Sequence, residues 1–127
     1  MKRIVLAAAL LAALPAFGQA FPTKPIRLVV PLGPGGGYDF VGRLMGEGLS
    51  HELGQPVVVE NRTGAGTVVG TTSVAKSAPD GYTIVVGGVG SIAQTAALTK
   101  DLPFDPAADL VALQLVDRKS TRLNSSH

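Results

Sequence analysis

The stretch Pro31-Leu32-Gly33-Pro34-Gly35-Gly36-Gly37-Tyr38-Asp39 joins a short apolar run, residues 26–30, to a run with helical spacing, residues 40–53. Its three successive glycines carry no Cβ, so backbone N–H groups could approach a bound anion closely. The N-terminus of the following helix would add partial positive charge. The stretch therefore predicts either an anion site or a strand-to-helix turn that only needs positive φ, and by itself it leaves both open.

Two further units of strand, glycine loop and helix follow along the chain. The expected strands are residues 26–30, 56–60 and 82–86, and the expected helices are residues 40–53, 67–78 and 92–98. Such a series predicts a parallel α/β sheet with right-handed connections and helices on both faces. Ligands of these sheets bind at the carboxyl ends of the strands, where the strand order reverses, and all three glycine loops would lie there.

The first helix has an apolar face that glycines interrupt. Apolar residues recur at every fourth position: Val41, Met45, Leu49 and Leu53. Gly42, Gly46 and Gly48 lie in the same helix, and each costs up to about 1 kcal/mol of helix stability relative to alanine. These glycines predict close packing of the helix on the sheet.

The two ends of the chain are expected to stand apart from the fold. Residues 1–20 carry Lys2 and Arg3, a short apolar run and a small-residue ending, which together predict a secretory signal peptide cleaved before Phe21. Residues 117–127, DRKSTRLNSSH, follow an apolar run at 110–116 that is expected to begin another strand. They correspond codon by codon to the translation of a common sequencing adaptor. We therefore expect residues 21–116 to be part of the N-terminal α/β domain of a longer protein, and the tail to be an artefact.

The charge and composition of residues 21–116 exclude several classes of protein. This part has 6 basic and 8 acidic side chains, whereas the whole chain has 11 and 9. No basic patch remains for a nucleic acid. The chain has no cysteine, so it predicts neither disulfides nor a lipoprotein anchor. No apolar run is long enough for a membrane span. Export to a bacterial periplasm is the simplest expectation.

The groups needed for catalysis are scarce. His51, the single histidine of residues 21–116, falls late in the first helix and is expected to be solvated. No nucleophile motif or metal-ligand spacing is present, so no catalytic residue, metal or cofactor is predicted. A dinucleotide pattern starting at Gly33 would place Tyr38 where its third glycine belongs. A Rossmann-like nucleotide-binding enzyme domain is thus the weaker alternative, and a purely structural secreted module is a third.

Four polar side chains at the loop edge allow more than one role. Asp39 is expected mainly to cap the first helix, although it could meet a ligand ammonium or hydroxyl group. Asn61 could cap locally or face a ligand. Tyr38 could pack or line a pocket. Ser91 could begin the third helix as its N-cap or bond a carboxylate.

Five motifs follow one another along the chain: Phe21-Pro22-x-Lys24-Pro25-Ile26-Arg27, Pro34-Gly35-Gly36-Gly37-x-Asp39, residues 53–66, residues 78–83 and Leu102-Pro103-Phe104-Asp105-Pro106. Together they resemble the receptors of tripartite tricarboxylate transporters, the Bug family. The resemblance implies the fold of type II periplasmic binding proteins, in which two α/β domains close on a small organic carboxylate. It also implies delivery of that ligand to membrane permease subunits.

The resemblance locates the ligand at the first glycine loop and at the loop after the third strand. The predicted ligand-binding residues are Pro34, Gly35, Gly36, Gly37, Tyr38, Asp39, Asn61 and Ser91. Tyr38 stands where the family often has Thr or Ser, so a hydroxyl contact from there would come from a phenol, displaced outward. The second domain, which supplies the opposing wall of the cleft, would lie beyond residue 116.

Overall fold

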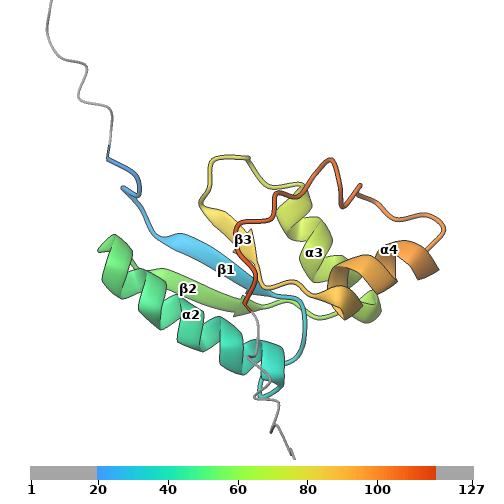
Figure 1. Ribbon diagram of the computed structural model, residues 1–127, viewed down its shortest axis with the longest axis horizontal. Helices are drawn as coiled ribbons and strands as arrows, with labels where there is room; N and C mark the ends of the chain where they lie inside the picture. The colour runs from blue at the N-terminus through green and yellow to red at the C-terminus, as the bar shows by residue number, and fades with distance from the viewer. Residues whose placement is uncertain (1–19, 117–127) are drawn as a thin grey trace, which may run out of the picture.

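The computed structural model describes residues 20–116 (Figure 1). The predicted signal peptide, apart from Ala20, and the predicted artefactual tail lie outside these residues. The described elements, in chain order, are β1 (Ile26–Val30), α2 (Gly37–Leu53), β2 (Val57–Asn61), the 3₁₀ turn η1 (Ala65–Thr67), α3 (Val68–Ala75), β3 (Thr83–Val85), the π-helical segment η2 (Val89–Ala93) and α4 (Gln94–Leu98).

The three strands form one parallel sheet in the order β2-β1-β3. β1 is the central strand, and Val29 and Val30 on its two faces are completely buried. Burial of both faces explains why residues 26–30 are apolar almost throughout rather than alternating. The predicted parallel α/β sheet is confirmed.

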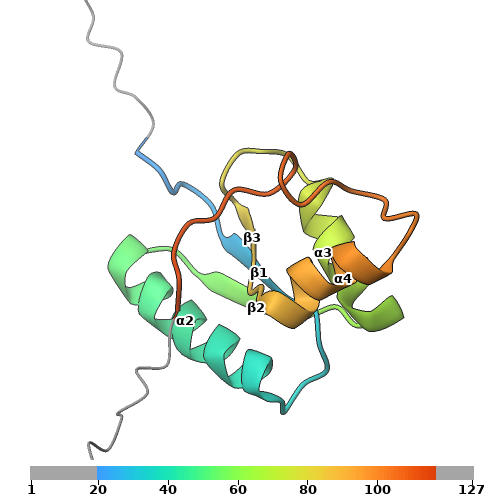
Figure 2. The same ribbon diagram turned by 45° about the vertical axis from the view of Figure 1, so that its right-hand side comes forward.

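Helices cover both faces of this sheet, as Figure 2 shows for α2 and α3. Gly42 of α2 lies so close to the sheet that a Cβ there would be 2.6 Å from Val30 Cγ2. Gly46 approaches Val59 in the same way. The prediction that these glycines permit close packing is confirmed, whereas Gly48 faces open space and the prediction for it was wrong.

Two helix boundaries differ from the sequence prediction. α2 begins at Gly37 rather than at residue 40, because Gly36 takes an extended N-cap conformation. The third helical segment begins at Val89 with a π-helical turn, so Ser91 lies inside it and is not an N-cap. Both differences arise at glycine loops, where helical periodicity gives no signal for the first residue.

The start of the described chain is tied to the turn before β3. The ring of Phe21 packs against Tyr82 in a tilted arrangement at 4.9 Å between centroids, and the backbone N–H of Thr23 donates to Tyr82 Oη at 2.9 Å. Lys24 lies over the same tyrosine ring and pairs with Asp80 at 3.3 Å. This cluster lies at the amino ends of the strands, away from the glycine loops.

Residues 110–116 form no strand in the described part of the chain, contrary to the sequence prediction. Val111, Leu113 and Leu115 are each more than three-quarters exposed. An apolar strand needs a neighbouring strand to pair its backbone and bury its side chains, and the described residues supply none here. Over residues 20–116, no helix has both the length and the apolar character that crossing a membrane requires.

Candidate functional site

The strand order determines where the glycine loops meet. The chain leaves β1 towards β2 on one side and later crosses to β3 on the other side. In open α/β sheets ligands bind where neighbouring connections leave in opposite directions, here between β1 and β3. The loops after these two strands, residues 31–36 and 86–88, flank that point.

The first glycine loop ends in free N–H groups. Pro34 and the three glycines after it are exposed, and Gly35 has a φ of 85°, which favours glycine. Gly36 is the N-cap of α2 and offers no side chain to the helix. Among residues 20–116, the N–H groups of residues 37–39 meet no acceptor. This end of α2 can therefore receive the oxygens of an anion.

Asp39, a residue that is 6% exposed, supports this loop through its carboxylate. Its Oδ2 accepts hydrogen bonds from the N–H of Gly35 at 3.0 Å and from Arg43 Nε at 3.1 Å. Its Oδ1 accepts one from Asn61 Nδ2 at 3.0 Å. The Gly35 N–H, with Arg43 and Asn61, lowers the pKa of Asp39 to about 2. Asp39 therefore holds the loop, and the Gly35 N–H is already occupied by it.

Asn61 completes the same network from the end of β2. Its Nδ2 also donates to the carbonyl of Leu32 at 3.1 Å, and its Oδ1 accepts from Arg43 Nη2 at 3.3 Å. Every polar atom of this amide is thus engaged within the protein. Sequence analysis did not single out Arg43, although its position four residues after Asp39 on a helix is a recognisable pairing signal.

The third loop is held by Ser91, which is 1% exposed. Ser91 Oγ accepts a hydrogen bond from the N–H of Gly88 at 2.8 Å. Gly88 in turn borders Tyr38, whose Oη occupies the space that a Cβ on residue 88 would take. The structure thus brings Tyr38 of the first loop against the third loop, while the Ser91 hydroxyl is buried beneath it.

Thr67 links the second glycine loop to the third, and sequence analysis gave no signal for it. It has a φ of 90°, which is rare for a β-branched residue, and it is buried. Its hydroxyl donates to the Ser91 carbonyl at 3.0 Å and lies 3.2 Å from Thr95 Oγ1. These buried hydrogen bonds offset the backbone strain at this position.

Replacing Thr67 by valine keeps the branched shape but removes the hydroxyl. We expect the free energy of unfolding to fall by about 1–3 kcal/mol, because the buried Ser91 carbonyl loses its donor. Thr67→Ser retains the hydroxyl and is expected to lose less. Urea unfolding of both variants measures the difference. A larger loss in Thr67→Ser than in Thr67→Val would show that the methyl group, not the hydroxyl, holds the loop.

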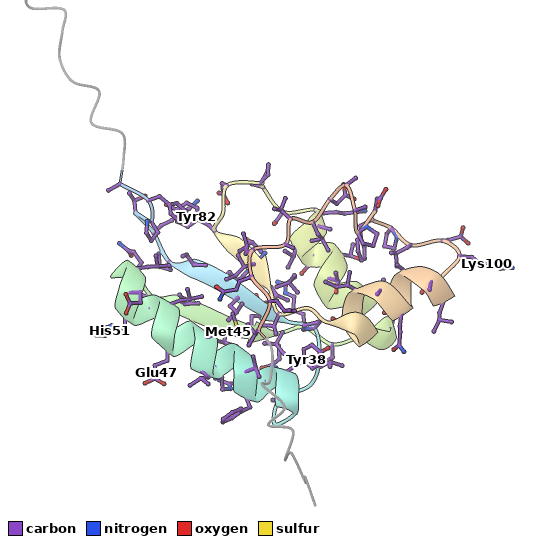
Figure 3. The ribbon with its side chains drawn as sticks, in the orientation of Figure 1. Tyr38, Met45, Glu47, His51, Tyr82 and Lys100 are labelled. Atoms are coloured by element: carbon purple, nitrogen blue, oxygen red, sulfur yellow. The ribbon has the colours of Figure 1, made fainter. Side chains whose placement is uncertain are left out.

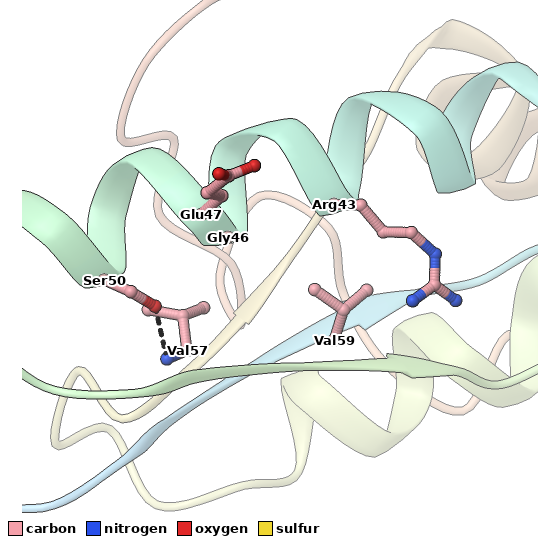
Figure 4. A pocket seen from close by; sticks show the side chains of 6 residues that line it. All are labelled: Arg43, Gly46, Glu47, Ser50, Val57 and Val59. Atoms are coloured by element: carbon pink, nitrogen blue, oxygen red, sulfur yellow. Dashed lines mark hydrogen bonds between the residues drawn. The ribbon is translucent and has the colours of Figure 1, made fainter.

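Two surface grooves lie elsewhere on the described residues. One, of about 310 Å³, runs between α2 and the edge strand β2 (Figure 4). It is lined by Arg43, Gly46, Glu47, Ser50, Val57 and Val59. The other, of about 250 Å³, lies between η1 and α4. None of the predicted ligand-binding residues lines either groove, so neither groove supports the predicted site.

Among the described residues, the loop edge has neither a histidine nor a cluster of metal-binding side chains. His51 lies at the opposite end of α2 from Tyr38 (Figure 3), and its side chain is 88% exposed. The prediction of a solvated helix histidine is confirmed. Among residues 20–116, no three metal-binding side chains gather into a cluster. The groups that converge at the loop edge are backbone N–H groups, the Tyr38 phenol and the Asp39 network.

Comparison with known proteins gives the family of this chain. Residues 41–126 match the model of the tripartite tricarboxylate transporter family receptor, which is more than half of the chain. Protein BugT of Bordetella pertussis is 41% identical over 105 residues, and a UPF0065 protein of the same organism is 43% identical over 104 residues. These matches cover 82% of this chain but 32% of each relative, so the chain spans about a third of their length.

Solved structures of similar proteins agree with the fold. MatC from Rhodopseudomonas palustris with bound malate is 40% identical, with a TM-score of 0.67 over 70% of this chain and 30% of that one. R. palustris Rpa4515 with adipate is 39% identical, with a TM-score of 0.64 over 68% and 29%. A structure described as a periplasmic transporter is 46% identical, with a TM-score of 0.64.

These matches confirm the predicted binding-protein fold over the part of the chain that they cover. They also decide between the receptor and the enzyme alternatives, because the matching family consists of transporter receptors. The chain belongs to the tripartite tricarboxylate transporter receptor family.

Proposed function

We propose that residues 21–116 form part of the first domain of a longer periplasmic receptor, which captures a small organic carboxylate. We call this longer protein the complete receptor. The observation that carries the proposal is the row of free N–H groups at the start of α2, above a loop that Asp39 holds in place. Charge-assisted hydrogen bonds from such groups suit a carboxylate. The malate and adipate bound by two relatives are acids of this kind.

The proposed partners follow from the family. A receptor of a tripartite transporter would present its ligand to permease subunits in the membrane. Export by a signal peptide at residues 1–20 would bring it to the periplasm, and a similar solved structure is described as a periplasmic transporter. Within this proposal the second domain would supply the opposing wall of the site and would cover apolar side chains such as Val111, Leu113 and Leu115.

Gly36→Val in the complete receptor tests the carboxylate site. A Cβ at this position would meet only the Gly33 carbonyl, at an ordinary 3.8 Å, so the fold should accept it. The branched side chain would crowd the N–H groups of residues 37–39. We expect affinity for small organic acids, measured by calorimetry with a panel that includes malate and adipate, to fall about tenfold or more, or about 1.4 kcal/mol.

Gly48→Val is the matched control, because residue 48 lies on the same helix and faces open space. It should bind the same acids as the wild type does. If Gly36→Val folds and binds like the wild type, the glycine loop is only a turn. If the wild type binds no acid of the panel, the proposed function is wrong.

A further inference from the structure

We propose that Tyr38 determines which carboxylate the site accepts, an inference that rests on the proposed function. Tyr38 is the side chain that reaches from the first glycine loop to the third. Its Oη fills the place of a side chain on Gly88, beside the point between β1 and β3 where a ligand would bind. The phenol therefore occupies volume inside the candidate site.

The loop against which this phenol packs is fixed by hydrogen bonds. The N–H of Gly88 donates to Ser91 Oγ at 2.8 Å, and the Gly88 carbonyl accepts from the N–H of Ile92 at 3.0 Å. Tyr38 itself is the second residue of α2, so its backbone is fixed by the first helical turn. The ring fills the space between its own helix and the Gly88 loop, both of which are held by hydrogen bonds, and it therefore limits the length of the site.

The hydroxyl of Tyr38 is available to a ligand. Over residues 20–116, Tyr38 Oη takes part in no hydrogen bond, although the side chain is half-buried. A phenol can donate to a carboxylate or hydroxyl oxygen. It stands beside the N–H groups that would hold the first carboxylate. The ring that limits the length of the site and the available hydroxyl together favour a short acid whose second oxygen group lies a few bonds from the first. They disfavour a long aliphatic acid.

Two substitutions test the ring and the hydroxyl of Tyr38 separately. Tyr38→Phe removes only the hydroxyl, and Tyr38→Thr removes the ring but keeps a hydroxyl. The probes are malate, which is short and rich in oxygen, and adipate, which is longer. Titration calorimetry on the complete receptor gives both affinities for each variant. Phe40→Thr is the matched control, because Phe40 lies two residues away on α2 and is 70% exposed.

We expect the wild type to bind malate about tenfold or more tightly than adipate. Tyr38→Phe should weaken malate binding about tenfold and change adipate binding much less, since a ligand oxygen loses its donor. Tyr38→Thr should reduce the preference for malate about tenfold by opening the site. Phe40→Thr should leave the preference unchanged.

The inference is overturned if the wild type prefers adipate, or if both Tyr38 variants keep the wild-type ratio of the two affinities. If Tyr38→Thr does not fold, an unchanged ratio in the isosteric variant Tyr38→Phe alone overturns the inference. A wild type that binds other acids of the wider panel but neither probe overturns the inference and leaves the proposed function standing. A wild type that binds no acid of the panel overturns both the inference and the proposed function.

Discussion

Replacing Gly70 by alanine is expected to destabilise the complete receptor, because the added methyl group would meet backbone atoms of two loops. A Cβ at residue 70 would lie 2.6 Å from the carbonyl oxygen of Arg62 and 2.8 Å from Pro31 Cα. Both are backbone atoms, so α3 would have to move away from the sheet. Overpacking of this kind costs about 1–3 kcal/mol or more. The gain in helix propensity, about 1 kcal/mol, offsets only part of it.

Gly48→Ala is the control for this prediction, because it adds the same methyl group to a helix where nothing lies within 4 Å. It is expected to stabilise the protein by about 0.5–1 kcal/mol. Urea unfolding of both variants measures the two changes. Ligand affinity should also fall in Gly70→Ala, because Pro31 and Arg62 begin the first two loops. Equal stability of the two variants would contradict the close packing of α3.

Asp39→Asn is expected to weaken organic-acid binding at least as much as Gly36→Val does. Asparagine can cap a helix, so a capping role alone would predict a small effect. The carboxylate, however, accepts hydrogen bonds from Gly35, Arg43 and Asn61. An asparagine amide cannot accept all three, because one of its two polar atoms is a donor. The loop would lose part of its support, and calorimetry with malate and adipate measures the consequence.

The same substitution should change the acid stability of the receptor. The folded pKa of Asp39 is about 2, below its ordinary value of 3.8. The ionised carboxylate therefore contributes its full stability above about pH 4, and this contribution is lost as the pH falls towards about 2. In Asp39→Asn the free energy of unfolding should decrease less steeply over this range. Glu47→Gln, an exposed carboxylate on the same helix, is the control, and parallel curves for Asp39→Asn and wild type would refute the prediction.

Local patterns in the sequence were enough to predict the architecture. Apolar runs bounded by glycine loops predicted β1, β2 and β3, and helical spacing with Gly42 and Gly46 predicted how α2 packs. These signals depend only on neighbours within a few residues, so they can be interpreted without knowledge of the rest of the fold. Boundaries at the loops were less predictable, because Gly37 and Val89 begin their helices where no periodic side chain marks the start.

The roles of the site residues were decided by the tertiary structure. The order β2-β1-β3 brings Asp39 to Asn61, Tyr38 to Gly88 and Thr67 to Ser91, pairs that are far apart in the sequence. Each contact sets a role that the residue type left open: Asp39 is a support, Tyr38 spans two loops, and Ser91 is buried.

The sequence by itself determined a parallel α/β fold with glycine loops at one edge, because periodicity and backbone freedom are local properties. The tertiary structure decided which polar groups remain free at that edge, because a hydrogen-bond partner is known only when the loops are placed together.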